Sequence, residues 1–256
     1  MPTLDLFKLD GKIALVTGAS KGLGQAIAVA LAEAGAGIIS LSRSPDSGTT
    51  AAQISAAGQH YHTIELDLGK ASVAELEAAV QKAITLEGRL DILVNNAGMI
   101  LRAPALNYSE TDWDTVLQID LKAVFFLSQI AARYMEKHGG GKIINIASLL
   151  SYQGGILVPS YSAAKHGIVG ITKALANEWA AKGINVNAIA PGYIDTEATA
   201  PLRADPVRNQ SILSRIPAGY WGQPSDLKGA AVFLASDAAK YLHGTTIDVD
   251  GGWMAR

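Results

Sequence analysis

Seven short apolar segments are spread along the chain, and most of them have no polar face. Strands that are apolar on both sides are typical of a parallel sheet that is covered by helices on both faces. The segments predicted to be strands are residues 12–17, 37–42, 61–66, 90–95, 141–147, 184–190 and 245–250.

Longer segments with helical spacing of apolar residues separate these strands. The clearest are residues 22–35, 72–88, 111–139 and 160–183. The alternation predicts repeated βαβ units with right-handed crossovers, so the expected fold class is α/β, a doubly wound parallel sheet. We expect residues 1–256 to form a single domain, in which the irregular stretch 192–222 contains a substrate lid.

The composition narrows the classes of function. A chain of 256 residues with 49% hydrophobic residues can bury a large core, and a net charge of -2 provides no general attraction for nucleic acid or anionic membrane. The absence of cysteine excludes disulfides and thiolate nucleophiles. The first residues lack the regions of a signal peptide, and no apolar run approaches a membrane span. We therefore expect a cytoplasmic protein without nucleic-acid or membrane partners.

The histidines do not suggest a metal centre. His60 and His62 share one face of a predicted strand, but the pattern supplies no third ligand. No metal is expected.

The segment "TGASKGLG" joins the first strand to the first helix. Glycines at 18, 22 and 24 allow a tight turn and a close approach of the backbone to a pyrophosphate at the helix N-terminus. Glycines also serve ordinary turns, but a strand before the motif and a helix after it favour dinucleotide binding.

Two further strand ends carry polar residues. Asp67 follows the third strand and either accepts a hydrogen bond from an adenine amino group or caps a turn. The segment "NNAG" (95–98) follows the fourth strand, at the edge where open α/β sheets bind ligands. Asn and Gly are also common turn formers, but the position favours function.

Tyr161 and Lys165 lie one helical turn apart in a segment of small residues. A phenol has a pKa of about 10 and is a poor base near neutral pH. An ammonium group nearby favours the phenolate, so we expect Lys165 to lower the pKa of Tyr161 and make proton exchange possible. The ordinary alternatives are core packing for Tyr161 and a solvated helix face for Lys165.

"TGASKGLG", "NNAG", Ser148 followed by "YSAAK", and "PGYIDT" (191–196) together resemble the short-chain dehydrogenase/reductase family over essentially the whole chain. The resemblance implies a seven-stranded Rossmann fold, a nicotinamide cofactor, and assembly through two long central helices and the C-terminal segment; we expect a homotetramer. It also implies roles for three residues. Tyr161 would be the general acid/base, Lys165 would hold the ribose and Ser148 would bind the substrate oxygen.

Asp120 departs from the family pattern. The family usually carries an asparagine at this position, where it supports a proton relay to the lysine. Aspartate keeps the acceptor oxygens, loses the amide donor and adds a charge. Asp120 is therefore included with Ser148, Tyr161 and Lys165 as a catalytic candidate, with the capping of a kinked helix as the alternative.

The resemblance also places residues after the sixth predicted strand in the cofactor site. Thr196 corresponds to the residue that contacts the nicotinamide carboxamide, although it is also a candidate helix N-cap. The residues expected to contact the dinucleotide are Gly18, Ser20, Lys21, Gly22, Leu23, Gly24, Ser42, Arg43, Asp67, Leu68, Asn95, Ala97, Gly98, Tyr161, Lys165, Pro191, Gly192, Ile194 and Thr196.

The choice between NAD and NADP stays open at this stage. An acidic residue at the end of the second strand would repel a 2′-phosphate, but that position holds Ser42, followed by Arg43. With Lys21 in the glycine loop, the local charge favours NADP. Segments such as "WGQPSDL" and "VDGGWMAR" are similar to those of dehydrogenases of deoxygluconates, a subgroup that uses mainly NAD.

A sugar-acid substrate needs a cation for its carboxylate, and Arg102 and Arg203 are the candidates. Gln153 and Trp221 are candidates for contacts with hydroxyl groups and a sugar face. The alternatives to a sugar-acid oxidoreductase are a reductase of another ketone, such as a 3-oxoacyl group on a carrier protein, and a dinucleotide-binding protein without turnover.

Overall fold

The computed structural model describes residues 2–46 and 48–255. All seven predicted strands are present in one sheet with the order β3-β2-β1-β4-β5-β6-β7, and every neighbouring pair is parallel. The predicted fold class is confirmed. The strands are β1 (Ile13–Thr17), β2 (Gly37–Ser42), β3 (Tyr61–Glu65), β4 (Ile92–Asn95), β5 (Gly141–Ile146), β6 (Ile184–Pro191) and β7 (Thr246–Val249).

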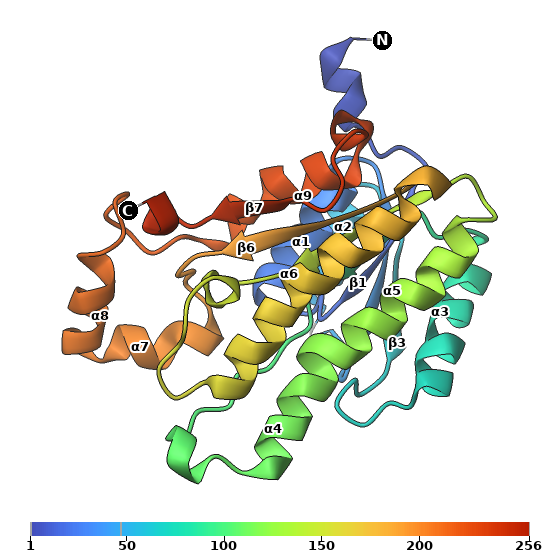
Figure 1. The fold of residues 1–256 in the computed structure, drawn as a ribbon. Helices are drawn as coiled ribbons and strands as arrows, with labels where there is room; N and C mark the ends of the chain where they lie inside the picture. Colours follow the sequence, from blue (N-terminus) through green and yellow to red (C-terminus); the bar gives the residue numbers. More distant parts are fainter. Residues whose placement is uncertain (1, 47, 256) are drawn as a thin grey trace.

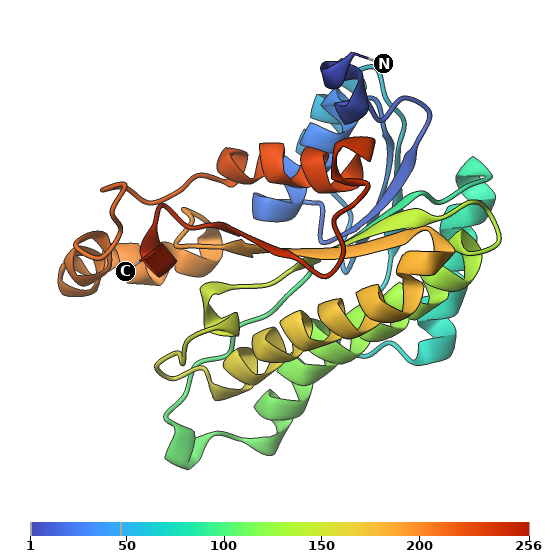
Figure 2. The same ribbon diagram turned by 45° about the horizontal axis from the view of Figure 1, so that its top comes forward.

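Helices cover both faces of this sheet, as Figures 1 and 2 show from two directions. One layer contains α1, α2 and α9, and the other contains α3, α5 and α6. Each layer buries its own apolar cluster against the sheet, which explains why the central strands have no polar face. The helices are α1 (Gly22–Glu33), α2 (Thr49–Ala56), α3 (Val73–Glu87), α4 (Glu110–Leu117), α5 (Ala123–Met135), α6 (Pro159–Trp179), α7 (Ala200–Ala204), α8 (Pro206–Leu213) and α9 (Lys228–Ala235).

The helix expected over 111–139 is divided by a π-helical turn at Gln118–Lys122. This turn contains the buried Asp120, whose carboxylate accepts a hydrogen bond from the backbone of Met99 outside the helix. A single wide turn of this kind is frequent at functional sites because it redirects one side chain without ending the helix.

The whole run Glu110–Met135 is long and apolar enough to cross a membrane, contrary to the expectation that no apolar run approaches that length. However, 56% of its most apolar window is buried inside the fold. A core helix of a globular protein has the same composition, because it packs against neighbours on several sides.

The segment expected to be irregular, 192–222, contains α7 and α8. The Asp205 side chain begins α8 by accepting hydrogen bonds from the backbone amides of Val207 and Arg208. A separate apolar cluster, which includes Ile212, Trp221 and Trp253, joins this segment to the C-terminal residues. In Figure 1, α7 and α8 stand beside the sheet edge.

Candidate active site

A pocket of about 730 Å³ lies at the carboxyl edge of the sheet, where the strand order reverses between β1 and β4. Ligands of open α/β sheets bind at this switch point. Many of the predicted cofactor residues line the pocket: Gly18, Ser20, Lys21, Gly22, Leu23, Gly24, Ser42, Arg43, Asp67, Leu68, Ala97, Gly98, Tyr161, Lys165 and Thr196.

The glycine loop has the geometry that a phosphate cradle needs. Gly18 and Gly22 have φ angles of 68° and 59°, a region that favours glycine. At Gly24, an added Cβ would lie 2.1 Å from the carbonyl oxygen of Gly18, so this position has no room for a side chain. The start of α1 therefore stays against the loop, with its free amides directed toward the pocket. These residues fit a dinucleotide pyrophosphate.

The structure corrects the prediction for Asn95. Its side chain is buried in the core and its amide donates to Ser128 and Asn145, so it joins β4 to β5 and α5 and does not line the pocket. The neighbouring Asn96 lines the pocket, and its amide donates to the carbonyl oxygens of Thr17 and Gly18. Successive side chains of an extended segment point in opposite directions, so Asn95 faces the core while the next residue, Asn96, faces the pocket.

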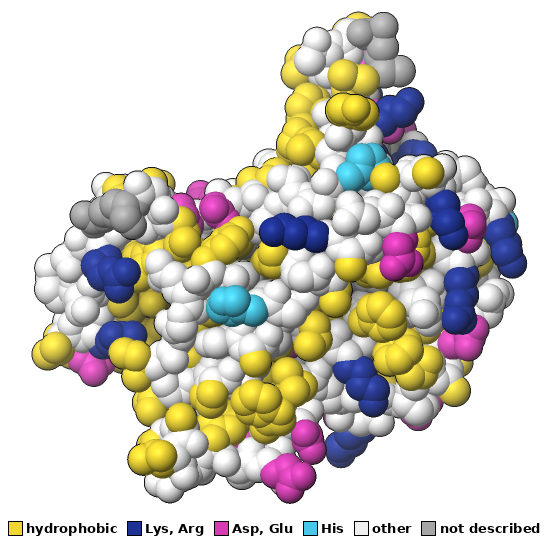
Figure 3. Space-filling model, in the orientation of Figure 1, with side chains coloured by type: hydrophobic (Ala, Val, Ile, Leu, Met, Phe, Trp, Pro, Cys, Tyr) yellow, Lys and Arg dark blue, Asp and Glu magenta, His cyan; other side chains and the backbone are white. Residues whose placement is uncertain are grey.

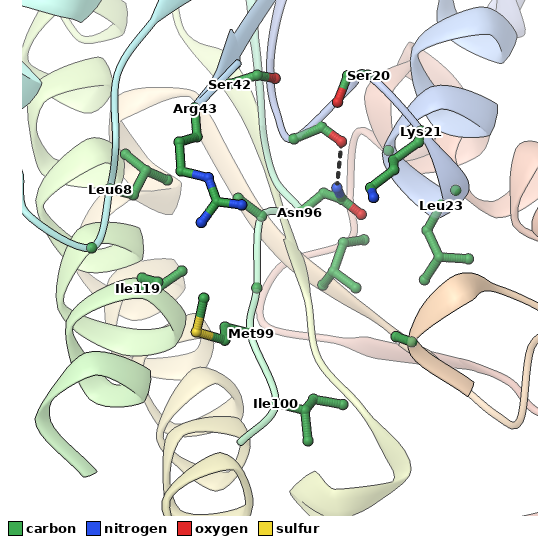
Figure 4. A pocket seen from close by; sticks show the side chains of 18 of the residues that line it. Ser20, Lys21, Leu23, Ser42, Arg43, Leu68, Asn96, Met99, Ile100 and Ile119 are labelled. Carbon is green, nitrogen blue, oxygen red and sulfur yellow. Dashed lines mark hydrogen bonds between the residues drawn. The ribbon is translucent and has the colours of Figure 1, made fainter. Parts of the chain in front are cut away.

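In Figure 4, the side chains of two cationic residues lie on opposite sides of Asn96, and both residues line the pocket. Arg43 extends into the pocket from β2, and Lys21 approaches it from the glycine loop. Lys21 also pairs with Glu197 from the segment after β6, so this ion pair spans the pocket. Asp67 lines the pocket, and its side chain also accepts a hydrogen bond from the amide of Gly69, as a turn-capping residue does.

Two contacts set the position of the segment that carries Tyr161. The Tyr108 hydroxyl lies 2.7 Å from the hydroxyl of Ser160 and donates to the carbonyl of Leu101, so the loop after β4 holds the first turn of α6. At the end of β5, Ser151 donates to the carbonyl of Lys165. These contacts bring the end of β5 and one face of α6 together at the pocket.

Lys165 is almost completely buried, with 4% of its surface exposed. Its ammonium donates to the carbonyl of Ile146 at 2.9 Å and lies 3.4 Å from the Asp120 carboxylate. Burial has the largest single effect and acts to lower the pKa of Lys165, but the attraction of Asp120, the attraction of Tyr161 and the hydrogen bond with Asp120 together raise it. Burial also raises the pKa of Asp120, opposed by the Lys165 charge. The lysine is therefore held as a cation.

The predicted effect of Lys165 on the pKa of Tyr161 is present, but burial of the phenol reverses the net direction of the shift. Lys165 favours the phenolate as expected, with its ammonium 5.4 Å from the centre of the ring. Burial of the phenol has a larger effect in the opposite direction, Asp120 adds to it, and the pKa of Tyr161 is raised. A hydrogen bond with Ser148 and the charge of Arg102 act to lower the pKa. Tyr161 is thus held as a proton donor.

Comparison with known proteins agrees with this geometry. The short chain dehydrogenase family model matches residues 12–207. The chain belongs to the short-chain dehydrogenase family. The family resemblance of the sequence motifs, and with it the prediction of an oxidoreductase, is confirmed.

Three relatives of this short-chain dehydrogenase cover nearly its whole length. The 2-dehydro-3-deoxy-D-gluconate 5-dehydrogenase of Escherichia coli (strain K12) is 52% identical over 254 residues, 99% of each chain. A protein from Agrobacterium tumefaciens solved with bound NADP is 54% identical, with a TM-score of 0.91 over 98% of this chain and 99% of that one. A gluconate 5-dehydrogenase from Burkholderia cenocepacia J2315 in complex with NADP and tartrate is 38% identical, with a TM-score of 0.94 over 99% of each chain.

At the other end of the dehydrogenase pocket, Thr196 both lines the wall and begins a short helix. Its side chain and that of Thr199 form reciprocal capping contacts, so the N-cap alternative is also correct. Pro191, Gly192 and Ile194 do not line the pocket. Gly192 packs against Asp250, where an added Cβ would lie 2.5 Å from the Asp250 Cα.

The four predicted substrate residues of the dehydrogenase have different surroundings. Arg102 is exposed, and its charge acts on Tyr161. Arg203 pairs with Asp195. Gln153 accepts a hydrogen bond from the indole of Trp253, and the indole of the buried Trp221 donates to Asn209. Of the two arginines, Arg102 is therefore the more available cation. Trp221 is held by Asn209 of α8, and Gln153 is held by Trp253 of the C-terminal segment.

Sequence reasoning did not identify several residues of the dehydrogenase pocket. These residues are mainly apolar and come from loops, with no motif of their own to mark them. They are Leu41, Ser44, Leu66, Gly69, Asn96, Met99, Ile100, Ile119, Ile146, Glu197 and Ala198. Only Asn96, inside the quoted "NNAG", carried a signal that could have found it.

Proposed function

We propose that this short-chain dehydrogenase interconverts a secondary alcohol and a ketone on a sugar acid, with 2-dehydro-3-deoxy-D-gluconate or 2-deoxy-D-gluconate as the substrate. The observation that carries the proposal is the Tyr161 phenol beside a buried, charged Lys165 in a dinucleotide-shaped pocket. The relatives that cover the whole chain act on such acids by name, which favours this class over a 3-oxoacyl reductase.

The proposed chemistry assigns the proton to Tyr161. When bound, the nicotinamide supplies or accepts the hydride. In the reductive direction, Tyr161 donates a proton to the ketone oxygen, and in the oxidative direction its phenolate takes the proton from the alcohol. Ser148 binds the same oxygen, and Lys165 stabilises the phenolate by its charge. The raised pKa of Tyr161 suits the donor role in the reductive direction.

We propose NADP as the preferred cofactor, with NAD as the weaker alternative. Ser42 ends β2 without a negative charge, and both Arg43 and Lys21 line the pocket. A 2′-phosphate would bind these two cations, whereas the 2′-hydroxyl of NAD would not need them. Two of the structural relatives contain NADP, which supports the assignment.

We assign the substrate carboxylate to Arg102. This arginine is exposed, its guanidinium is 3.4 Å from the carbonyl of Ala198, which lines the pocket, and its charge acts on Tyr161. A neutral backbone partner leaves its charge available for an anion, in contrast to Arg203, which already pairs with Asp195.

A second copy of the chain is proposed to cover the outer face of α4, α5 and α6. A groove of about 1020 Å³ on this face is lined by Leu121, Phe125, Phe126 and Ile171. Hydrophobic side chains gather over these helices in Figure 3. We propose a homotetramer built partly through this face.

We also infer a cytoplasmic setting from the cysteine-free composition.

The test is a spectrophotometric panel of sugar acids with NADH and NADPH. We expect turnover of deoxygluconates, and a loss of about 100-fold or more in Tyr161→Phe, the usual contribution of a general acid/base. Arg102→Ala should raise the KM for acids and leave the KM for matching uncharged polyols unchanged. Turnover that Tyr161→Phe leaves intact would refute the assigned proton donor, and dinucleotide binding without any turnover would favour a binding protein.

The cofactor assignment has its own test. Arg43→Ser removes a cation from the proposed phosphate site, and we expect the KM for NADPH to rise by about tenfold, as for loss of one charge-assisted hydrogen bond. The KM for NADH should change much less. Equal effects on both cofactors would contradict the NADP proposal.

A further inference from the structure

Asp120 is a carboxylate with an unusual position. It lies in the π-helical turn Gln118–Lys122, its exposed fraction is 0%, and one oxygen accepts a hydrogen bond of 2.7 Å from the Met99 amide. The second oxygen has no hydrogen-bond partner among the described residues. That oxygen is 3.4 Å from the Lys165 ammonium.

The fold gives this carboxylate a fixed place. An added Cβ on Gly98 would lie 3.0 Å from the same oxygen, so the "NNAG" segment packs closely against the carboxylate. Lys165 approaches the same oxygen, and its ammonium also donates to the carbonyl of Ile146. A buried ion pair between rigid elements cannot reorganise easily, so its charges act on their neighbours at constant distance.

We propose that Asp120 is a positioning residue that sets the working pH of the enzyme, by countering the Lys165 ammonium that faces Tyr161. The inference rests on the proposed function for which reaction is catalysed. The effect of Asp120 on the titration of the Tyr161 phenol does not depend on that function. An anion behind the ammonium reduces the attraction that Lys165 exerts on the Tyr161 phenolate. The carboxylate therefore keeps Tyr161 protonated to a higher pH than a neutral side chain would.

The charges around Tyr161 give the sign of the effect. Lys165 on α6 and Arg102 after β4 act to lower the pKa of Tyr161, as does the hydrogen bond with Ser148 at the end of β5. Asp120, on the π-helical turn, acts to raise it. Removal of the Asp120 charge should accordingly lower the pKa of Tyr161 and favour its use as a base in oxidation.

The variant that tests this is Asp120→Asn, which keeps the size and the acceptor for the Met99 amide. We expect the lower limb of the pH profile of kcat/KM for alcohol oxidation to move down by about one pH unit, the size of effect expected from one nearby charge. The matched control is Glu136→Gln, which removes one carboxylate from an exposed pair with Lys182 and should leave the profile unchanged.

A titration that needs no turnover separates this inference from the proposed function. The phenolate absorbance of Tyr161 is obtained as the difference between each protein and its Tyr161→Phe counterpart, with and without Asp120→Asn. If the titration shifts downward and no sugar acid is turned over, the inference stands and the proposed substrate fails. An unchanged or upward shift overturns the inference.

A purely structural role has a different signature. It would lower activity equally at every pH and lower the melting temperature without moving the titration, and that outcome also overturns the inference. If Asp120→Asn does not fold, Asp120→Ser removes the same charge and keeps an oxygen near the Met99 amide. The same downward shift is expected of it.

Discussion

Burial acts to lower the pKa of two lysines of this fold, but the net shifts have opposite signs. Lys165 is enclosed together with Asp120, and the attraction of that carboxylate and of Tyr161 raises the pKa of Lys165 against the effect of burial. Lys142, at the start of β5, donates to the neutral amide oxygen of Asn185 at 2.9 Å. Burial lowers the pKa of Lys142, and the more distant Asp237 does not compensate. Nearby opposite charges thus decide whether the pKa of a desolvated lysine rises or falls.

This difference predicts how stability depends on pH. The pKa of Lys142 is lower in the folded state than the ordinary value of 10.5, so the unfolded chain binds more protons between these two values. The free energy of unfolding should therefore rise with pH in that window. We expect the free energy of unfolding of the wild type to rise relative to that of Lys142→Met as the pH approaches 10.5.

The measurement is denaturant unfolding at a series of alkaline pH values. The control is Lys82→Met, which changes an exposed lysine of α3 and should give a curve parallel to that of the wild type. A parallel curve for Lys142→Met as well would mean that Lys142 is not desolvated in the folded protein.

Among the elements, the turn between β1 and α1 is held mainly by close packing of its backbone at Gly24. Gly24 lies in the first turn of α1 and packs against the carbonyl of Gly18. The side-chain amide of Asn96, which follows β4, donates to the same carbonyl. An added Cβ at Gly24 would lie 2.4 Å from that amide nitrogen. The glycine is required by packing, whereas Gly22 is required by its positive φ angle.

Gly24→Ala should therefore separate α1 from the loop. We expect a loss of about 1–3 kcal/mol in the free energy of unfolding, typical of overpacking, together with weaker binding of NADPH by calorimetry. Gly170→Ala, within α6 and with nothing within 4 Å of the added Cβ, is the matched control. It should raise stability by about 0.5–1 kcal/mol. Wild-type stability and affinity in Gly24→Ala would contradict the close packing.

At the scale of the whole molecule, the helical run from α4 to α5 presents two surfaces. One contributes to the core against the sheet and α3, while Phe125 and Phe126 also line the outer groove. We expect light scattering to give the mass of a tetramer for the wild type. Phe125→Asp should shift the distribution to smaller species, because it places a charge in the proposed contact. Leu4→Asp, at a position that is 80% exposed, is the control. A monomeric wild type would refute the proposed assembly.

Much of the architecture was predictable because it depends on local patterns. The seven strands follow from short apolar runs, and α3 is marked by Ser72 and Glu75, which cap each other at its start, and by Gly88 at its end. The helices α2 and α9 were not identified, since their eight residues each give too few turns for a clear period. The helices α7 and α8, with five and eight residues, were not identified for the same reason.

The sequence by itself determined which residues are candidates for the chemistry: the spacing of the glycines, and the separation of four positions between Tyr161 and Lys165, are local features that one turn or one helix translates directly into geometry. Only the tertiary structure decided that Asn96 lines the pocket while Asn95 lies in the core. It also decided that Arg203 forms an ion pair with Asp195, and that burial has the largest effect on the pKa of Tyr161. These outcomes depend on side-chain direction, on desolvation and on contacts made only in the folded chain, and the local patterns of the sequence contain none of these.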